Sequence, residues 1–419
     1  MLLFSHPTGN ANVRHAALGL HRAGLIREFW TCINYRGRNP LTRLLPGGVR
    51  GQLARRSFPD ELQPCLRAHP WREAGRLLAH RLGARSLVRH ETGLLSVDAV
   101  YHSLDRRVAR RLRSGGFAGL YAYEDGAAFS FREAKQRGQV CLYDLPIGYW
   151  RAARELLLEE AELEPGWAST LVGNDDSPAK TARKDEELAL ADRVYVASTY
   201  TLKTLSAAPG FSAPVEVIPY GAPTRPATAP RRTEREGTGP LRVIFVGSLG
   251  QRKGLSYLFA ACRALGRAVE LTIIGTPPLT ECPALQTELR REGVRWIPSC
   301  PHSEVLAEMA AHDVFVFPSL FEGFGLVLLE AMAMGLPIIA TSHTAAPDLI
   351  EDGREGFIVP IRSSAAIAEK LERLHRDRAW INHLGAQAAT RAAHFTWDNY
   401  GQRLAESVAR ACQTSTAQG

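Results

Sequence analysis

The stretch that decides the fold is DVFVFPSLFEGFGLVLLEAMAMGLPIIA, residues 313–340. It opens with a short apolar run rich in β-branched residues and passes through a loop that contains two glycines. It then continues as an apolar helical segment and closes with a second apolar run. Short apolar runs of this kind are typical of strands buried on both faces of a parallel sheet. In such sheets, ligands bind beyond the carboxyl ends of the strands, which here is the glycine-containing loop.

The rest of the second half repeats this alternation on both sides of the stretch. We expect strands at residues 242–248, 269–275, 294–297, 313–317, 336–340 and 356–359, and helices at 254–265, 285–291, 303–311 and 325–334. Strands that alternate strictly with helices predict a doubly wound parallel sheet.

The first half follows the same logic with more insertions. We expect strands at residues 2–5, 97–102, 119–123, 140–143, 193–197 and 215–218, and helices at 12–23, 104–112 and 184–190. Residues 36–90 are rich in arginine and are expected to be helical. The predicted fold class is therefore α/β, with two Rossmann-like doubly wound domains that face each other across a cleft.

The chain of 419 residues is long enough for two domains. Residues 222–240, APTRPATAPRRTEREGTGP, offer almost nothing to bury and are predicted to be the linker. This division gives a first domain at residues 1–221 and a second at 241–395. A final helix at about 396–419 is expected to cross back onto the first domain.

The net charge of +8 is concentrated in the first half. Residues 1–123 carry about 20 basic and about 7 acidic side chains, and most of the basic ones fall within 36–113. Such a region fits an anionic partner such as a lipid-linked phosphate or a membrane face, and solvated helix faces are the alternative. Aromatic residues are not interleaved with the arginines, so we expect no nucleic acid partner.

Seven cysteines are scattered along the chain without a C-x-x-C pair, which argues against a disulfide framework and a structural zinc site. The apolar run at the N-terminus is too short for a signal peptide, and no run approaches a membrane span. We therefore expect a cytoplasmic protein. Peripheral attachment at the inner face of the membrane stays open.

The loop at 318–325 has the strongest chemical signal. It leads into a helix that holds one carboxylate, Glu330, among apolar residues, and a carboxylate in such a place needs a partner. The start of a helix exposes backbone N–H groups and suits an anion, and Gly323 and Gly325 allow a ligand to approach closely. A phosphate at the helix start, with hydroxyl groups held by Glu322 and Glu330, would satisfy all these groups. An internal cap is the alternative.

A second candidate follows the first strand of this half. Its sequence GSLGQRKG, residues 247–254, brackets Arg252 and Lys253 with glycines, which suits a diphosphate. It is neither a P-loop nor a G-x-G-x-x-G fingerprint. A solvated basic loop is the alternative.

Together these motifs resemble the donor-binding domain of glycosyltransferase family 4, a group of retaining enzymes with the GT-B fold. The similar pieces are residues 247–254, 313–319, 322–325 with Glu330, 335–341 and 352–359. Glu322 and Glu330 stand at the spacing of the family's E-x7-E motif. The resemblance implies the GT-B fold and a nucleotide-diphosphate sugar as co-substrate, with no bound cofactor.

Carried over by position, the resemblance implies that Arg252 and Lys253 hold the diphosphate and that Glu322 contacts the transferred sugar. These three residues are the catalytic candidates. Glu330 would contact the ribose hydroxyls. The donor-binding candidates are Glu330, Gly323, Phe324, Gly325, Leu326, Gly250, Gly9 and Asn10.

One departure from the family concerns a histidine that often follows a central strand of its first domain. The comparable stretch here, YAYEDG at 121–126, contains none. Glu124 or Asp125 is expected to serve in its place or to bind the acceptor, and Asp144 at the next strand end is a third acceptor-side candidate. A structural turn is the alternative for each.

The expected reaction is hexosyl transfer without a metal. No D-x-D motif offers ligands for one, so Arg252, Lys253 and the helix start would stabilise the leaving diphosphate. The resemblance implies retention, and we expect front-face attack with the leaving phosphate as base. The acceptor would be a saccharide, a lipid-linked sugar or a small molecule, in cell-envelope or exopolysaccharide assembly. A same-fold sugar-nucleotide epimerase or phosphorylase, or a catalytically silent nucleotide-sugar-binding subunit, is the alternative.

Overall fold

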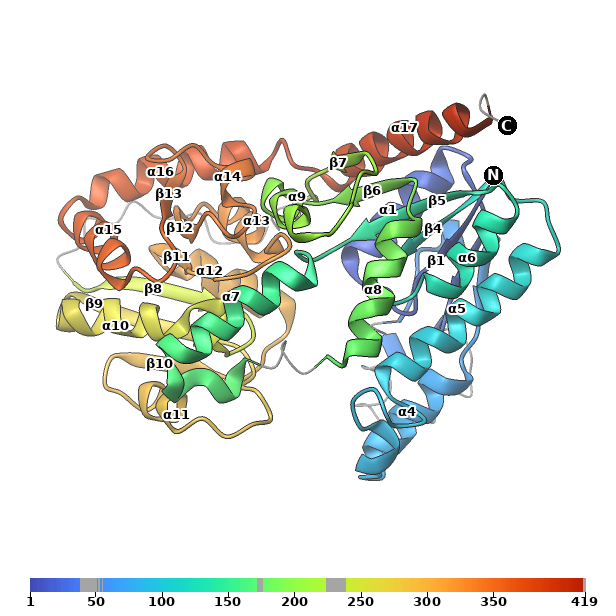
Figure 1. Ribbon diagram of the computed structural model, residues 1–419. Coiled ribbons are helices and arrows are strands. Elements are labelled where there is room, and N and C mark those ends of the chain that lie inside the picture. The colour runs from blue at the N-terminus through green and yellow to red at the C-terminus, as the bar shows by residue number, and fades with distance from the viewer. Residues whose placement is uncertain (38–50, 52, 55, 172–175, 224–238, 417–419) are drawn as a thin grey trace.

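Two parallel β-sheets lie side by side in the computed structural model, each with helices on both faces (Figure 1). The structure describes residues 1–37, 51, 53–54, 56–171, 176–223 and 239–416. The sequence prediction of a GT-B arrangement with two doubly wound sheets is confirmed.

The first sheet has the strand order β3-β2-β1-β4-β5-β6-β7, and all its neighbouring strands are parallel. Its strands are β1 (Leu2–Ser5), β2 (Ile26–Thr31), β3 (Leu66–Ala68), β4 (Gly119–Tyr123), β5 (Val140–Leu145), β6 (Arg193–Val196) and β7 (Val215–Val217). The order reverses between β1 and β4, so the loops after these two strands diverge and leave room for a ligand.

The second sheet has the order β10-β9-β8-β11-β12-β13 and is also parallel throughout. Its strands are β8 (Leu241–Val246), β9 (Val269–Ile274), β10 (Val294–Ile297), β11 (Val314–Phe317), β12 (Ile338–Thr341) and β13 (Gly356–Val359). All six predicted strands of this half are present. The order reverses between β8 and β11.

The helices that flank the first sheet are α1 (Ala11–Arg22), α4 (Trp71–Arg81), α5 (Val97–Arg113), α6 (Ala128–Gln136), α8 (Pro178–Leu190) and α9 (Thr199–Thr204). Those of the second sheet are α10 (Leu255–Leu265), α11 (Pro283–Leu289), α12 (His302–Ala311), α13 (Leu326–Ala333), α14 (Ala346–Leu349), α15 (Ser364–Arg376) and α16 (Arg378–Ala392). Two more helices, α7 (Trp150–Leu163) and α17 (Trp397–Thr416), link the halves.

One predicted strand is wrong. Residues 97–102 form the first turns of α5, which is capped by the hydroxyl of Ser96. The alternating apolar residues also fit a helix, because Val100, Leu104 and Val108 recur every four residues and are all buried. The apolar residues at 97–102 that predicted a strand are the beginning of a longer apolar stripe on this helix.

Two strands were missed in the first half. In β2 the buried Glu28 lies next to the aromatic pair Phe29 and Trp30, and Glu28 is paired with Arg111 of α5. That charge masked the apolar run. The strand β3 is only three residues long and lies within residues 36–90, which were expected to be helical. Residues 38–50, 52 and 55 of that region lie outside the described residues.

The helix α7 precedes β6 in the chain, contacts the first half near η5 (Leu205–Ala207) and reaches across to the second half (Figure 1). Its buried Glu160 accepts hydrogen bonds from Gln251 (2.7 Å) and Tyr257 (2.9 Å) and pairs with Arg362 (2.7 Å). The short helix η3 (Pro165–Thr170) continues the contact. Thr170 accepts a hydrogen bond from the backbone N–H of Gln251 at 2.8 Å, which braces the loop after β8.

The helix α17 makes the opposite crossing and lies along α1 (Figure 1). The two helices approach closely at Gly19 and Gly401, where a Cβ added to Gly19 would lie 2.5 Å from the Cα of Gly401. The aromatic rings of Tyr220, Trp397 and Tyr400 pack together where the chain re-enters the first half.

The two halves also meet directly at Gly323. Its carbonyl oxygen accepts hydrogen bonds from the hydroxyls of Ser198 (2.5 Å) and Thr201 (2.9 Å). A Cβ at Gly323 would lie 1.9 Å from the carbonyl oxygen of Pro146, so a side chain at this position would force the halves apart.

The boundaries at 221 and 241 stay a prediction, and most of the predicted linker, residues 224–238, lies outside the described residues. Within the described stretches, no helix combines the length and the apolar character that a bilayer-spanning segment requires. All seven cysteines are free thiols.

Candidate active site

The candidate site is built on the loops that follow β8 and β11, the two neighbouring strands at which the order of the second sheet reverses. The first loop ends in the short helix η6 (Gln251–Lys253) and at Gly254, whose φ is +68°. A Cβ at Gly254 would lie 2.0 Å from the carbonyl oxygen of Pro318, so a glycine is needed for the two loops to close on each other.

The closure brings the three catalytic candidates together. The ammonium group of Lys253 pairs with the carboxylate of Glu322, and Nη1 of Arg252 lies 3.4 Å from the same oxygen. The guanidinium of Arg252 also donates to the carbonyl of Phe321 at 2.6 Å. Lys253 lies over the ring of Phe317, 4.9 Å from its centre. Two cations and one carboxylate thus share a small, largely buried space.

Burial and charge act against each other in this cluster. Burial lowers the pKa of Lys253 to about 8, although the neighbouring Glu322 raises it. For Glu322, burial opposes ionisation, but Lys253 and Arg252 outweigh it and lower the pKa of the carboxyl. The carboxylate is therefore ionised at neutral pH, and Lys253 titrates in a range that a bound anion would shift upward.

The second loop leads into α13 through Gly325, whose φ is +86°. This left-handed residue turns the chain so that the helix can start at Leu326. Phe324 is buried against Tyr220, with ring centres 5.0 Å apart. Gly323, Phe324, Gly325 and Leu326 therefore form a rigid turn, and Gly323 is also part of the contact between the halves.

Glu330 projects from α13 toward α12. One of its carboxylate oxygens lies 3.0 Å from Nε2 of His302, and this hydrogen bond raises the pKa of the imidazole. Glu330 is half-buried whereas His302 is exposed. The lone carboxylate of the apolar helix thus has a partner in His302, at the start of α12.

A cavity of about 420 Å³ opens beside the cluster, and both halves line it. Gly250, Arg252 and Lys253 contribute from the loop after β8. Trp150, Arg154 and Leu157 contribute from α7, Thr170 and Leu171 from the end of η3, Asp176, Thr181 and Lys184 from the start of α8, and Pro277 and Pro278 from the loop after β9. Sequence reasoning missed the lining from α7, η3 and α8. The amphipathic run WRAARELLLEEAEL was the signal that could have identified α7.

The three acceptor-side candidates have different surroundings. Glu124 lines the cavity, 3.7 Å from the ammonium of Lys184, and burial raises its pKa to about 7. Asp125 adopts a left-handed conformation with φ +68°, and its side chain lies 3.8 Å from Lys184 without lining the cavity. Asp144 is buried in the core of the sheet, where it accepts a hydrogen bond from Tyr121 at 2.7 Å.

The remaining donor-side candidates lie after β1. Gly9 packs against Phe58, since a Cβ there would lie 2.9 Å from its ring. Asn10 precedes α1 and is exposed, and its side chain does not cap the helix. Neither residue lines the cavity beside Arg252. Of the candidates, only Gly250, Arg252, Lys253 and Glu124 line the cavity, and Glu322 joins them through its ion pairs with Arg252 and Lys253. The remaining candidates, which are not among its lining residues, are Gly323, Phe324, Gly325, Leu326, Glu330, Gly9, Asn10, Asp125 and Asp144.

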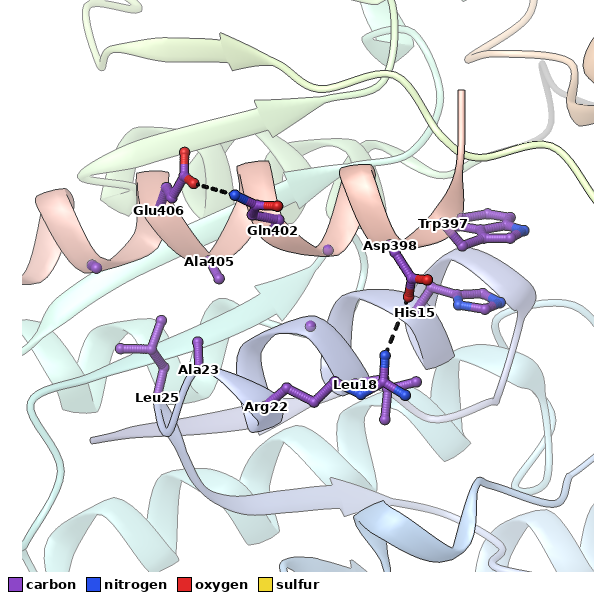
Figure 2. A pocket seen from close by; sticks show the side chains of 13 residues that line it. His15, Leu18, Arg22, Ala23, Leu25, Trp397, Asp398, Gln402, Ala405 and Glu406 are labelled. Atoms are coloured by element: carbon purple, nitrogen blue, oxygen red, sulfur yellow. Dashed lines mark hydrogen bonds and ion pairs between the residues drawn. The ribbon is translucent and has the colours of Figure 1, made fainter. Parts of the chain in front are cut away.

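Another cavity, of about 500 Å³, lies between α1 and α17 (Figure 2). Its lining is mostly apolar, and two of its three charged residues, Arg22 and Asp398, are paired with each other at 3.2 Å, the third being Glu406. It lies apart from the loops after β8 and β11. The cavity beside Lys253 is therefore the candidate active site.

Comparison with known proteins identifies the family. Residues 240–377 match the family model described as glycosyl transferases group 1. The chain is 30% identical over 288 residues to a GDP-mannose-dependent alpha-(1-6)-phosphatidylinositol monomannoside mannosyltransferase of Mycolicibacterium smegmatis, covering 62% of this chain and 72% of that one. The chain belongs to the group 1 glycosyltransferases. The matched family segment contains Arg252, Lys253, Glu322 and Glu330.

Two further likenesses are consistent with this family. The chain is 34% identical over 153 residues to the amylovoran biosynthesis glycosyltransferase AmsK of Erwinia amylovora, 33% of this chain and 37% of that one. Matches to polysaccharide relatives of this kind span little more than a third of their length. Its fold resembles that of HepE from Anabaena, solved with UDP and glucose, with a TM-score of 0.63 and 16% identity over 98% of this chain and 99% of that one.

Proposed function

We propose that this protein is a retaining, metal-independent hexosyltransferase that uses a nucleotide-diphosphate sugar. The observation that carries the proposal is the cluster of Arg252, Lys253 and Glu322 at the point where the strand order of the second sheet reverses. Two cations at such a point suit a diphosphate, and a carboxylate beside them suits sugar hydroxyls. Family membership favours transfer over an epimerase, a phosphorylase or a silent subunit.

The positive charges of the cluster would assist departure of the leaving group. Departure of the nucleoside diphosphate places negative charge on the phosphate oxygen that was bonded to the sugar. Arg252 and Lys253 would stabilise that charge together with the backbone N–H groups at the start of α13, and their fixed positions make this stabilisation effective. Because these cations already surround the phosphate site, a metal ion is not needed for the step.

Glu322 would hold hydroxyls of the transferred sugar. Its carboxylate is ionised at neutral pH and now pairs with Lys253, so a bound diphosphate would take over that cation and free carboxylate oxygens for the sugar. Glu330 would hold the ribose, with His302 positioning its carboxylate. The leaving phosphate would accept the proton of the acceptor hydroxyl on the same face, so that the configuration at the sugar is retained.

The acceptor would enter from the side of Glu124 and Lys184, which line the same cavity from the first half. Relatives named for amylovoran biosynthesis and for mannosylation of a phosphatidylinositol mannoside support an envelope or exopolysaccharide acceptor. We place the enzyme in the cytoplasm, where nucleotide sugars are available, with peripheral attachment to the inner face of the membrane.

A thermal-shift panel tests the donor site. UDP, GDP, ADP and TDP and their sugars are added at millimolar concentration without metal. The ligands that carry one of these bases should raise the melting temperature, because stabilisation follows RT ln(1 + [L]/Kd). Glu330→Ala should remove the shift, whereas Glu304→Ala, an exposed carboxylate on α12, should keep it. Equal shifts in both variants would reject the assigned role of Glu330.

Product stereochemistry tests the reaction. An α-linked donor should give an α-linked product, and a β-linked product would overturn the proposed front-face attack. Glu322→Ala should lose transfer, whereas Glu330→Ala should mainly raise the KM for the donor. Equal losses of kcat alone would contradict these roles.

A further inference from the structure

The helix α4 is oriented with apolar side chains toward solvent. Trp71 is 78% exposed, Leu78 57% and Leu82, directly after the helix, 73%. The three positions are seven and four residues apart, so at about 100° per residue they fall within a stripe about 40° wide. An exposed apolar stripe of this kind costs solubility and marks a surface that meets a partner.

Buried charges hold α4 in this orientation. The carboxylate of Glu73, on the inner side of the helix, pairs with Arg56 at 2.6 Å and with Arg76 at 2.7 Å. Burial opposes ionisation of Glu73, but the two arginines outweigh it and lower the pKa of the carboxyl. Rotating the helix to hide Trp71 would break this buried ion-pair network, which would be costly in free energy of folding.

The apolar surface continues past the helix. After α4 come the short helix η2 (Arg85–Val88) and a loop that folds back, with the backbone N–H of Leu95 bonded to the carbonyl of Leu87 at 2.8 Å. Arg72 of α4 donates to the carbonyl of Leu94 and fixes the loop beside the helix. We call this area the α4 surface; its exposed apolar residues are Trp71, Leu78, Leu82, Leu87, Leu94 and Val97.

Positive charge surrounds these residues. Between Trp71 and Val97 the sequence has five arginines and two glutamates, and both glutamates are paired within the protein. Arg81, Arg85 and Arg89 are exposed, and none of the three forms an ion pair or a side-chain hydrogen bond with the other residues that the structure describes. Exposed Trp and Leu flanked by unpaired arginines match the interface of an anionic membrane.

The geometry points to the α4 surface as a docking site for an anionic phospholipid bilayer. Trp71, Leu78 and Leu82 would enter the boundary between headgroups and acyl chains, and the arginines would pair with lipid phosphates. The inference does not depend on the reaction proposed above, because the α4 surface shares no residue with the cluster of Lys253 and Glu322.

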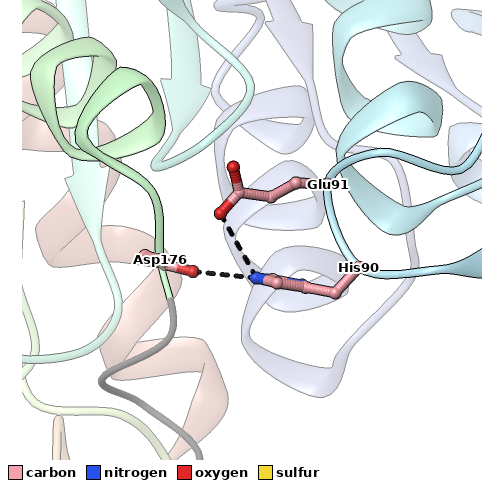
Figure 3. Close-up of side chains that lie close together, drawn as sticks. All are labelled: His90, Glu91 and Asp176. Atoms are coloured by element: carbon pink, nitrogen blue, oxygen red, sulfur yellow. Dashed lines mark ion pairs between the residues drawn. The ribbon is translucent and has the colours of Figure 1, made fainter.

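The loop of the α4 surface is connected to the wall of the candidate active site (Figure 3). His90 lies 3.4 Å from Glu91 and 3.2 Å from Asp176, which lines the cavity. Glu91 also accepts hydrogen bonds from the backbone N–H (2.8 Å) and the hydroxyl of Ser177. Docking through the α4 surface would therefore hold this wall of the cavity close to the bilayer, where a lipid-borne acceptor could reach it.

Co-sedimentation of the full chain with vesicles tests the inference. The protein should bind vesicles with about a third phosphatidylglycerol, bind phosphatidylcholine vesicles weakly, and be released by salt. Trp71→Ser/Leu78→Ser/Leu82→Ser should lower binding about tenfold or more. The control Leu158→Ser/Leu163→Ser removes exposed leucines of α7 and should bind as the wild type does.

Arginine variants and a fluorescence measurement test the inference independently of the triple variant of Trp71, Leu78 and Leu82. Arg81→Gln/Arg85→Gln should weaken binding by about fivefold for each arginine. Arg267→Gln/Arg290→Gln removes the same charge from the second half, where both arginines are exposed, and should change little. Brominated lipids should quench wild-type fluorescence more than that of Trp71→Phe, which keeps an aromatic ring.

Three outcomes would overturn the inference: no binding of the wild type to anionic vesicles, equal binding by the α4 variants and their controls, or quenching unchanged by Trp71→Phe. Light scattering tests the alternative that the α4 surface binds another protein. A wild-type dimer that the triple variant converts to a monomer, without vesicle binding by either, would also overturn it and assign the α4 surface to a second copy of the chain.

Discussion

Replacing Glu322 by glutamine should make the affinity for a nucleoside diphosphate steeply dependent on pH. Lys253 is buried with a pKa of about 8, and the charge of Glu322 is what keeps it from falling lower. Glutamine keeps the shape and one oxygen acceptor but removes the charge. Loss of one opposite charge at such close range changes a proton affinity by roughly ten- to a thousandfold.

The magnitude follows from the protonated fraction. With a pKa of about 8, about half of the wild-type Lys253 side chains carry a proton at pH 8. In Glu322→Gln about a tenth or fewer would carry one, and a ligand that binds the charged form loses affinity in proportion. The variant should therefore bind at least about fivefold more weakly than the wild type at pH 8. At pH 6 a variant whose proton affinity has fallen about tenfold should bind at least as tightly, because most of its Lys253 is then protonated and no carboxylate competes for it.

Isothermal titration at pH 6, 7, 8 and 9 measures this crossover with the nucleotide selected by the thermal-shift panel. The phosphate groups of the ligand titrate equally in each experiment, so the ratio of the two dissociation constants isolates the protein. Lys253→Met should give weak binding with no crossover. Parallel profiles for the wild type and Glu322→Gln would refute the reasoning, since they would show that Glu322 does not control the protonation of Lys253.

Three further predictions concern stability. Gly323→Ala should cost about 1–3 kcal/mol or more by overpacking the contact between the halves, whereas Gly239→Ala, in open space, should be near neutral in urea unfolding; equal midpoints would contradict the clash. Glu160→Ala should cost about 3–5 kcal/mol by leaving a guanidinium without its buried partner. Glu159→Ala, an exposed partner of the same guanidinium, should cost under about 1 kcal/mol, and a similar cost for both would be inconsistent with that network. Burial raises the pKa of Asp144 from 3.8 to about 7, so the folded state holds the extra proton in that window and stability falls as pH rises through it. Asp144→Asn should therefore gain Tm relative to the wild type at pH 8 but not at pH 4, and a constant difference would argue against a buried proton.

The second sheet could be predicted from sequence because its strands are short, mostly apolar runs in which a charged residue stands only at the second position. β11 has no charged residue, and the single charge of β8, Arg242, stands next to its start, so the apolar signal is local. β2 was not predicted, because its charged residue Glu28 is neutralised by Arg111 of α5, which is 83 residues away in the chain. A partner at that distance cannot be read from a window of the sequence.

The residues of the candidate site, too, could be predicted from the sequence only in part. The family resemblance assigned Arg252, Lys253 and Glu322 to one site, and the structure brings them into contact because their loops follow neighbouring strands of one sheet. The positions of Glu124 and Asp144 could not be separated in this way. Both stand at strand ends, but only tertiary packing decides that one lines the cavity and that the other lies beneath a tyrosine cluster.

The crossing of α7 has a consequence for how the protein is made. During synthesis the first half leaves the ribosome first, but the inner face of α7 has its partners in residues that are translated later, among them Gln251 and Arg362. Until then Glu160 is an uncompensated carboxylate, because only the start of α7 has partners in the first half, among them Asp185 and Asp176. The nascent first half should therefore keep α7 loose and protease-sensitive, and it should gain protection only when the chain has been extended past Arg362.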